Sequence, residues 1–296
     1  MKEMVKNDYY QRIERAINFI EDNLMNKLTV ETIAQKAFFS KYHFIRVFKA
    51  TTGETVGNYL RRRRISRSSK SLINSNRSIL TIALDYQFES QEAYTRSFKK
   101  VYGTSPRKYR MQNKDQIAFG RARLTIERLN HLKSNVTMTP KIVDIDKKKL
   151  VGLSILTSLA NNKIPKLWND FMLRIGEIKN NANTGCYEVN PFDSSFKIES
   201  FTKDKEFEKW ATVEVHSFDG IPAGLKPLTI EGGKYAVFKH KGKMSNIQMS
   251  FDYAYGTWLP NSEYQLDARA SFERYGAQYL GPDNPDSITE LWIAIK

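Results

Sequence analysis

The sequence predicts a multidomain protein: an all-α N-terminal domain with two helix-turn-helix motifs, and an α+β C-terminal domain with an antiparallel sheet and a pseudo-twofold repeat. Three observations predict this. A short helical unit occurs twice in the first 110 residues, positive charge is concentrated in the first 136, and strand-like and helix-like segments alternate twice after Pro140. A chain of 296 residues is long enough for two cores. We expect domains at residues 1–111 and 137–296, joined by a basic linker at 112–136.

The repeated helical unit is found by sliding residues 82–110 back along the chain. At an offset of 49 residues, Ile82 and Phe88 fall on Ile33 and Phe39. Beyond Ser90 the offset becomes 50, and it pairs Arg96 with Arg46, Phe98 with Phe48, Lys99 with Lys49, Gly103 with Gly53 and Tyr109 with Tyr59. Self-similarity at a fixed period, with one residue gained at a turn, indicates a duplicated structural unit.

Each copy has the pattern of a short helix, a tight turn and a second helix. Before the first copy, apolar residues at three- and four-residue spacing predict a packing helix over residues 8–24. Thr29 is expected to cap the next short helix, Ser40 to cap the helix after it, and Gly53 to end that helix. In the second copy, Ser78 and Ser90 begin the corresponding helices. Two short helices joined in this way form a helix-turn-helix, whose second helix enters the DNA major groove.

A longer helix is predicted between the two copies, from residue 54 to about residue 73. At ~1.5 Å per residue it spans roughly 28 Å, close to the ~34 Å that separates successive major-groove faces on one side of DNA. It therefore has the length of a rod that spaces two reading helices. Its four consecutive arginines, Arg61 to Arg64, wind almost once around the axis, so we expect one or two phosphate contacts and a solvated remainder.

The second helix of each copy has a polar face that we predict to meet DNA bases. In the first copy this face holds Tyr42, Ile45, Arg46 and Lys49; in the second it holds Gln91, Glu92, Thr95 and Arg96. An arginine can bind guanine through two hydrogen bonds, and Ile45 can contact a thymine methyl group. Gln91 can pair with adenine. Glu92 either accepts a hydrogen bond from cytosine or only stabilises the helix N-terminus.

Charge is divided unevenly between the two predicted domains. Residues 1–136 hold 27 Lys and Arg against 12 Asp and Glu, whereas residues 137–296 hold 20 of each kind. The whole net charge of +15 therefore belongs to the first domain and its linker, where Arg121, Arg123 and Arg128 are available for nonspecific phosphate contacts. A positive field confined to one domain suits a polyanion, and double-stranded DNA is the partner we expect.

The closing sequence of the repeat, FKKVYGTSPRKYR, resembles the DNA-binding domain of the AraC/XylS transcription regulators, and the resemblance covers residues 8–110. In members of this family the first reading helix directs tryptophan, glutamine and arginine towards the bases. These positions are Tyr42, Ile45 and Arg46 here, so only the arginine is kept. The two glutamines of the second reading helix become Gln91 and Glu92, with Arg96 kept. The resemblance therefore implies a promoter-binding protein, but it does not carry over the DNA sequence that other members of the family read.

After Pro140, alternating patterns predict strands over residues 141–145, 149–156, 210–218, 232–242 and 289–296, and helices over 165–178 and 243–259. The order strand, helix, strand occurs in residues 140–219 and again in 225–296. Two such halves predict one α+β domain with a cleft between them.

This half resembles the GyrI-like effector-binding domains, through LVGLS, LWNDF, IEGGKYAVFKHKG, YGTWLP, FERY and ELWIAI. The pairing of the two domains resembles regulators of the Rob type. The resemblance implies a ligand between the halves, held by aromatic residues and a glutamate on the last strand: Glu290, Trp292, Trp258, Trp168 and Trp210. A structural salt bridge at Glu290 and purely packing roles for the tryptophans are the alternatives. Glu273 is expected to be structural, bound to Arg274 or to the neighbouring turn.

The leading hypothesis is therefore a cytoplasmic transcription regulator of the multidrug or stress-response type, an activator that contacts RNA polymerase. It would bind a small amphipathic, possibly cationic effector, and a monomer would suffice for two adjacent grooves. We expect no cofactor, no membrane span and no enzyme activity. The alternatives are a hydrolase of small electrophiles with Glu290 as base, and a ligand-independent architectural DNA binder. The single cysteine, Cys186, excludes an internal disulfide, and His216 and His240 are expected to be isolated surface or core residues.

Overall fold

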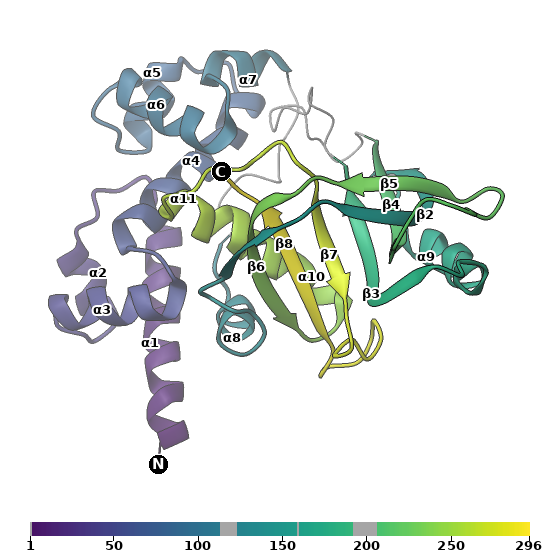
Figure 1. Ribbon diagram of the computed structural model, residues 1–296. Coiled ribbons are helices and arrows are strands. Elements are labelled where there is room, and N and C mark those ends of the chain that lie inside the picture. The colour runs from purple at the N-terminus through teal and green to yellow at the C-terminus, as the bar shows by residue number, and fades with distance from the viewer. Residues whose placement is uncertain (1, 113–122, 159, 192–205) are drawn as a thin grey trace. The chain divides into compact units, whose positions relative to one another are not determined.

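The computed structural model describes residues 2–112, 123–158, 160–191 and 206–296, and it divides into two compact units (Figure 1). The first unit contains the chain up to Ser134 together with residues 252–261. The second unit contains the rest of the described chain from Asn135 onward. In the described residues, no helix is both long enough and apolar enough to cross a membrane.

The first unit is helical. Its helices are α1 (Lys2–Asp22), α2 (Val30–Lys36), α3 (Lys41–Thr52), α4 (Val56–Asn74), α5 (Ile79–Asp85), α6 (Gln91–Tyr102), α7 (Pro106–Gln112) and α8 (Ile126–Ser134). The two predicted helix-turn-helix motifs are α2–α3 and α5–α6, and α4 connects them. The helix α8 was not predicted from the linker sequence. It forms because Leu124, Leu129 and Leu132 are buried, so this part of the linker packs as a folded element.

The two motifs begin and end their helices in matching ways. The hydroxyl groups of Thr29 and Ser78 accept hydrogen bonds from backbone N–H groups of α2 and α5. At Thr29 a capping box forms even though no carboxylate is present, because the Thr32 hydroxyl takes its place. Gly53 and Gly103 end α3 and α6 in the left-handed conformation, with φ of 79° and 71°.

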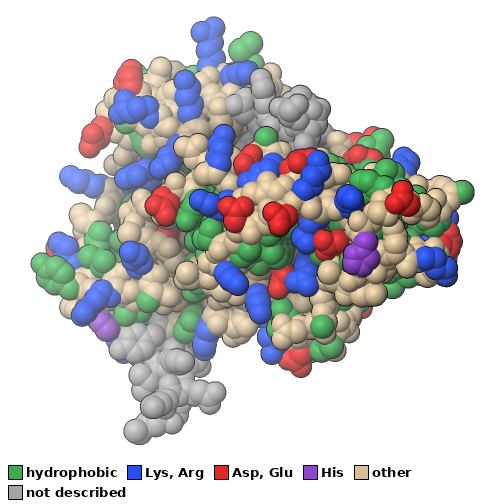
Figure 2. Space-filling model, in the orientation of Figure 1, with side chains coloured by type: hydrophobic (Ala, Val, Ile, Leu, Met, Phe, Trp, Pro, Cys, Tyr) green, Lys and Arg blue, Asp and Glu red, His purple; other side chains and the backbone are tan. Residues whose placement is uncertain are grey.

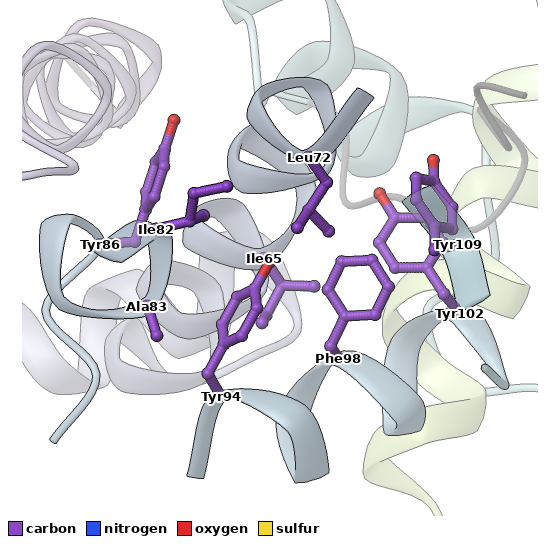
Figure 3. Close-up of a cluster of buried hydrophobic side chains, with 9 residues drawn as sticks. All are labelled: Ile65, Leu72, Ile82, Ala83, Tyr86, Tyr94, Phe98, Tyr102 and Tyr109. Carbon is purple, nitrogen blue, oxygen red and sulfur yellow. The ribbon is translucent and has the colours of Figure 1, made fainter. Parts of the chain in front are cut away.

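The core of the second motif is built on aromatic side chains from α6 and α7 that pack against α4 (Figure 3). The ring of Phe98 lies 4.7 Å from that of Tyr102 and 5.2 Å from that of Tyr109, measured between centroids. The first motif repeats this arrangement 50 residues earlier, where the rings of Phe48 and Tyr59 are 5.7 Å apart. The duplication therefore extends to the packing of the core.

The arginine run on α4 is more structural than predicted. Arg63 is buried and donates two hydrogen bonds of 2.6 Å to the carboxylate of Glu21 on α1. Arg64 donates to the backbone carbonyls of Leu24 and Asn26, just beyond the end of α1. Two of the four arginines thus hold α1 to α4, and the expected solvated remainder was wrong for them. Arg61 is exposed.

The second unit contains one antiparallel sheet of eight strands. They are β1 (Lys141–Ile145), β2 (Lys148–Thr157), β3 (Asn181–Asn190), β4 (Phe207–Val215), β5 (Lys226–Ile230), β6 (Gly233–Lys241), β7 (Ser271–Tyr275) and β8 (Ile288–Ala294), in the spatial order β1-β6-β8-β7-β3-β4-β2-β5. The predicted helices are α9 (Ile164–Met172) with the 3-10 turn η2 (Ile175–Glu177), and η4 (Met244–Asn246), α10 (Ile247–Tyr253), the π-helix η5 (Ala254–Trp258) and α11 (Leu259–Asn261). The strands β3, β5 and β7 were not predicted.

The strand order confirms the pseudo-twofold repeat. Exchanging each strand of the first half with its counterpart in the second, β1 with β5, β2 with β6, β3 with β7 and β4 with β8, returns the same order read backwards. The symmetry axis therefore passes between β3 and β7. Each half also gives its first strand to the other, because β1 pairs with β6 and β5 pairs with β2.

The two faces of this sheet bury different side chains. On the outer face Val151, Ala211 and Val213 pack against Leu167 and Phe171 of α9. On the inner face Leu150, Tyr187, Tyr235 and Phe272 form a cluster to which β1 and β5, from the two edges of the sheet, both contribute. The sheet is thus curled around its inner face.

Candidate DNA-binding and effector-binding sites

The predicted reading face of α3 is exposed. Phe44 and Phe48 are fully buried and fix the rotation of the helix. Tyr42 is 78% exposed and Ile45 is 36% exposed, and Arg46 and Lys49 are exposed beside them. All four predicted side chains therefore lie on one accessible strip that mixes an aromatic ring, an aliphatic group and two positive charges, as a major-groove reader requires.

The helix α6 repeats this exposure. Gln91, Glu92 and Arg96 are exposed, whereas Thr95 is half-buried. At the first turn of α6, the Glu92 carboxylate accepts hydrogen bonds from the Ser90 hydroxyl and from its own backbone N–H, and these hold the pKa of Glu92 below its ordinary value. The carboxylate is thus ionised and stabilises the helix N-terminus, and its exposure leaves it accessible to a base as well.

In the view of Figure 2, basic side chains are scattered over the helical unit and few acidic ones lie among them, whereas acidic and basic side chains are mixed over the sheet. This agrees with the division of charge in the sequence, in which the whole surplus of +15 precedes residue 137. In the linker, Arg121 lies outside the described residues, and Arg123 donates a hydrogen bond of 2.8 Å to Asn18 on α1. A positive helical surface with two exposed reading faces fits the polyanionic backbone of DNA.

The five residues predicted to hold a ligand do not lie together. Trp168 is on α9 and covers the outer face of the sheet. Trp210, on β4, and Trp292, on β8, belong to the inner face. Trp258 is in η5, a segment that groups with the first unit. Glu290 shares the inner face with Trp292.

At Glu290 the carboxylate is already bound within the fold. It accepts a hydrogen bond of 3.0 Å from the Arg274 guanidinium and one of 3.1 Å from the Trp292 indole N–H. Arg274 stands directly opposite Glu290 in the pairing of β7 with β8, and the Trp292 ring stacks on Phe272 at 5.3 Å. Glu290 and Trp292 thus project from one face, as their spacing predicted. The side chain of Glu290 is 24% exposed, so this site is half-buried.

A second acidic site, not predicted from the sequence, lies on the outer face at the symmetry axis. Glu188 on β3 stands directly opposite Glu273 on β7, and the side chains of both are 6% exposed. Glu188 accepts a hydrogen bond of 2.7 Å from the Trp168 indole N–H, and Glu273 accepts one of 2.9 Å from the Tyr275 hydroxyl. The Trp168 and Tyr275 rings meet edge to face at 5.2 Å. Two carboxylates are thus enclosed by aromatic side chains.

Lys209 on β4 supplies the positive charge of this outer site. Its ammonium group lies 2.7 Å from Glu188 Oε1 and 3.8 Å from Glu273 Oε1. Burial alone disfavours ionisation of Glu188, but the charge of Lys209 and the hydrogen bonds outweigh it and lower the pKa of Glu188. Burial, followed by the nearby charge of Glu188, raises the pKa of Glu273 to about 7. The two opposed carboxylates share one counter-ion, and their pKa values therefore differ.

The expectation for Glu273 was wrong in one respect. Glu273 is structural in the sense that it is buried, but it is not bound to Arg274, which projects from the opposite face of the sheet towards Glu290. The reason is the alternation of neighbouring side chains in a strand. The signal in the sequence was the strand SFERY itself, whose outer positions place the glutamate and Tyr275 on the same face.

The two histidines noted in the sequence have different surroundings. No group of three or more His, Cys, Asp or Glu side chains among them could hold a metal ion. His240 is fully buried, as expected for a core residue, with Nδ1 2.8 Å from the Ser250 hydroxyl and Nε2 3.1 Å from the Lys243 carbonyl. His216 is exposed. The buried His240–Ser250 pair therefore has the features of a core hydrogen bond.

Comparison with known proteins identifies both halves. The family described as integron-associated effector binding protein matches residues 141–295, and the helix-turn-helix domain family matches residues 33–112. The transcriptional regulator Rob of Salmonella typhimurium (strain LT2) is 30% identical over 263 residues, which cover 87% of this chain and 87% of that protein.

Two further relatives match a smaller share of the chain. The multiple antibiotic resistance protein MarA of Escherichia coli (strain K12) is 38% identical over 122 residues, 41% of this chain and 92% of that protein. The transcriptional activator AarP of Providencia stuartii is 41% identical over 101 residues, 34% of this chain and 75% of that protein. With both halves matched in the same order as in Rob, the chain belongs to the Rob family of DNA-binding transcriptional regulators, in which an AraC-type helix-turn-helix domain is joined to an effector-binding domain.

Proposed function

We propose that this regulator activates promoters of multidrug or stress-response genes by placing α3 and α6 in two major grooves, and that a small amphipathic cation controls it. The observation that carries the DNA-binding part is the repeated exposed face, with Arg46 and Arg96 at equivalent positions 50 residues apart. The names of two relatives, the transcriptional activator AarP and the multiple antibiotic resistance protein MarA, support an activator connected with antibiotic resistance. Contact with RNA polymerase is part of this proposal, because an activator must influence the polymerase.

We propose further that one chain is sufficient on DNA. The helix α4 has 19 residues, so at ~1.5 Å per residue it spans roughly 28 Å, close to one helical repeat of DNA. Two reading helices in one chain then do the work that other helix-turn-helix proteins divide between two subunits. A regulator that meets the chromosome acts in the cytoplasm, and this is where we place it.

For the effector, the outer site at Glu188 and Glu273 is our first candidate. It combines two buried carboxylates with the aromatic rings of Trp168 and Tyr275, and carboxylates with aromatic faces are the groups that attract organic cations. The inner site at Glu290 and Trp292 is the second candidate, where a ligand would have to displace Arg274. The two candidates lie on opposite faces of the sheet, so single substitutions separate them.

The test is a binding experiment on the full-length protein. Tetraphenylphosphonium, a lipophilic monocation, is titrated against wild type, Glu273→Gln and Glu290→Gln, with tryptophan fluorescence and calorimetry as readouts. Loss of affinity in Glu273→Gln alone assigns the outer site, and loss in Glu290→Gln alone assigns the inner site. If no cation binds wild type, whereas selection from random DNA still yields a specific sequence, the cationic effector is rejected and the DNA-binding function stands.

We propose that the chain is not an enzyme. The Rob, MarA and AarP relatives are named as regulators or resistance proteins, and in the described residues the carboxylates of both candidate sites are bound by Lys209 or Arg274. Incubation of the protein with small epoxides and esters, followed by chromatography, checks this. Turnover that disappears in Glu290→Gln would revive the hydrolase alternative.

A further inference from the structure

We infer that the Lys209 ammonium group occupies the proposed cation-binding site on the outer face, and that it limits which cations the regulator can bind. This inference rests on the proposed effector function and deepens it, because it names the residue that sets the affinity of the outer site for positive charge. An organic cation that enters between Glu188 and Glu273 must push the Lys209 ammonium aside or share the two carboxylates with it.

The position of Lys209 carries the inference. It projects from β4, the neighbour of β3, onto the same face as Glu188, and its side chain is only 12% exposed. A lysine is rarely buried to this extent without a partner, and here the partner is Glu188 at 2.7 Å. The site formed by Glu188, Glu273 and the neighbouring aromatic rings therefore already holds one positive charge on an alkyl chain. An alkyl chain that ends in a positive charge has the same chemistry as an amphipathic cation.

The two carboxylates near the Lys209 ammonium group do not interact with it equally. Glu188 receives hydrogen bonds from Lys209 and Trp168, whereas Glu273 lies 3.8 Å from the ammonium, too far for a hydrogen bond. The nearest donor to Glu273 is the Tyr275 hydroxyl at 2.9 Å. Tyr279, the other titratable group whose charge is coupled to this pair, lies beyond Tyr275, with ring centroids 4.7 Å apart. When both carboxylates are ionised, the site holds one uncompensated negative charge at Glu273.

The charge of Lys209 affects which ligands can bind. In wild type a monocation is attracted by the uncompensated carboxylate of Glu273 but is repelled by the nearby ammonium group of Lys209. This repulsion is strong because the site is buried. Removing the ammonium abolishes this repulsion and frees the volume of the lysine side chain. Lys209 therefore keeps the affinity for monocations low, so that only a cation with enough apolar surface can compete with it.

The test compares variants that remove the ammonium with variants that remove an equivalent ion pair elsewhere. Lys209→Met takes away the charge, and Lys209→Met with Glu188→Gln takes away the pair, so that Glu273 remains and net charge is conserved. The matched control is Lys148→Met with Glu214→Gln, because Lys148 lies 2.8 Å from Glu214. Full-length protein is titrated with tetraphenylphosphonium at pH 8, after circular dichroism has shown that each variant is folded.

The expected result is that both Lys209 variants bind the cation on the order of tenfold more tightly than wild type, and that the control pair does not change the affinity. Affinity that is unchanged or weaker in the charge-conserving double variant would overturn the inference while leaving the effector function intact.

A second titration uses decanoate. If wild type binds this anion and Lys209→Met loses it, Lys209 is an anion receptor and the inference is also overturned. If no variant binds the cation, the inference and the cationic effector fail together, whereas selection of a specific DNA sequence would still support the regulator.

Discussion

Phe38 and Gln87 hold the same left-handed backbone conformation, with φ of 56° and 61°, at equivalent positions 49 residues apart. Each is the second residue after the first helix of its motif, where the chain turns towards the reading helix. Residues other than glycine are strained in this region, by about 1–2 kcal/mol. Both motifs keep this strained conformation, because the turn sets the angle between their two helices.

Replacing Phe38 with glycine is expected to relieve this strain. The comparison with Phe38→Ala is the informative one, because both variants lose the contact of the ring with Arg15 and only glycine loses Cβ. Alanine is ordinarily the more stabilising of the two, since glycine has more freedom in the unfolded chain. At this turn we expect the glycine variant to be more stable by about 1 kcal/mol, measured by urea denaturation. Equal stability, or a more stable alanine variant, would contradict the strain.

Breaking the ion pair between Arg63 and Glu21 is expected to destabilise the helical unit strongly. The side chains are 11% and 6% exposed, so Arg63→Met leaves a carboxylate that is buried without its cation. Such a change costs on the order of 3–5 kcal/mol. The control is Arg61→Met, two residues earlier on the same helix and exposed, which should change stability by less than about 0.5 kcal/mol. Restoring much of the loss with Glu21→Leu in addition would show that the unpaired charge was the cause.

The helical unit was predictable because its signals are local. Caps such as Thr29 and Ser78, stops such as Gly53, and a repeat with buried phenylalanines determine helices that are close in sequence. The exceptions are the helix α8, which the linker sequence did not predict, and Arg63. The partner of Arg63, Glu21, lies 42 residues away, so only the tertiary structure distinguishes Arg63 from exposed Arg61.

The sheet was only partly predictable because strand partners are distant. The strand β3 contains asparagine, threonine and glycine and gives no clear alternation, and the short strand β5 contains Pro227, which argues against a strand. Their places are set by pairing with β4 and β2. For the same reason the pairing of Glu188 with Glu273, 85 positions apart, could not be derived from periodicity, whereas the shared face of Glu290 and Trp292 followed from a spacing of two.

At the DNA interface, Arg46 and Arg96 are expected to read bases. An arginine that binds guanine through two hydrogen bonds contributes about 1–3 kcal/mol of discrimination at one base pair. Arg46→Ala and Arg96→Ala should each relax the sequence preference at one position, and the two positions should differ by about one helical turn. Selection from random DNA, followed by sequencing, measures this. Lys226→Ala, an exposed change in the second unit, should leave the preference unchanged. A uniform loss of affinity without relaxed preference would assign the arginines to phosphates instead.

The proton on Glu273 is expected to make stability depend on pH. Its pKa is raised from 4.5 to about 7 in the folded state by burial and by Glu188, so the folded protein binds this proton more tightly than the unfolded chain does. The resulting stabilisation is fully present below pH 4.5 and is lost as the pH rises through 7. At ~1.4 kcal/mol per pH unit, the loss is about 3 kcal/mol. Glu273→Gln keeps a neutral side chain of the same shape at every pH, so it should be more stable than wild type at pH 8 and should lose this advantage at pH 5.

Thermal unfolding at the two pH values measures the difference, and Glu231→Gln, an exposed glutamate paired with Lys147, is the control. An advantage of the same size at both pH values would show that Glu273 does not change its protonation state between pH 5 and pH 8.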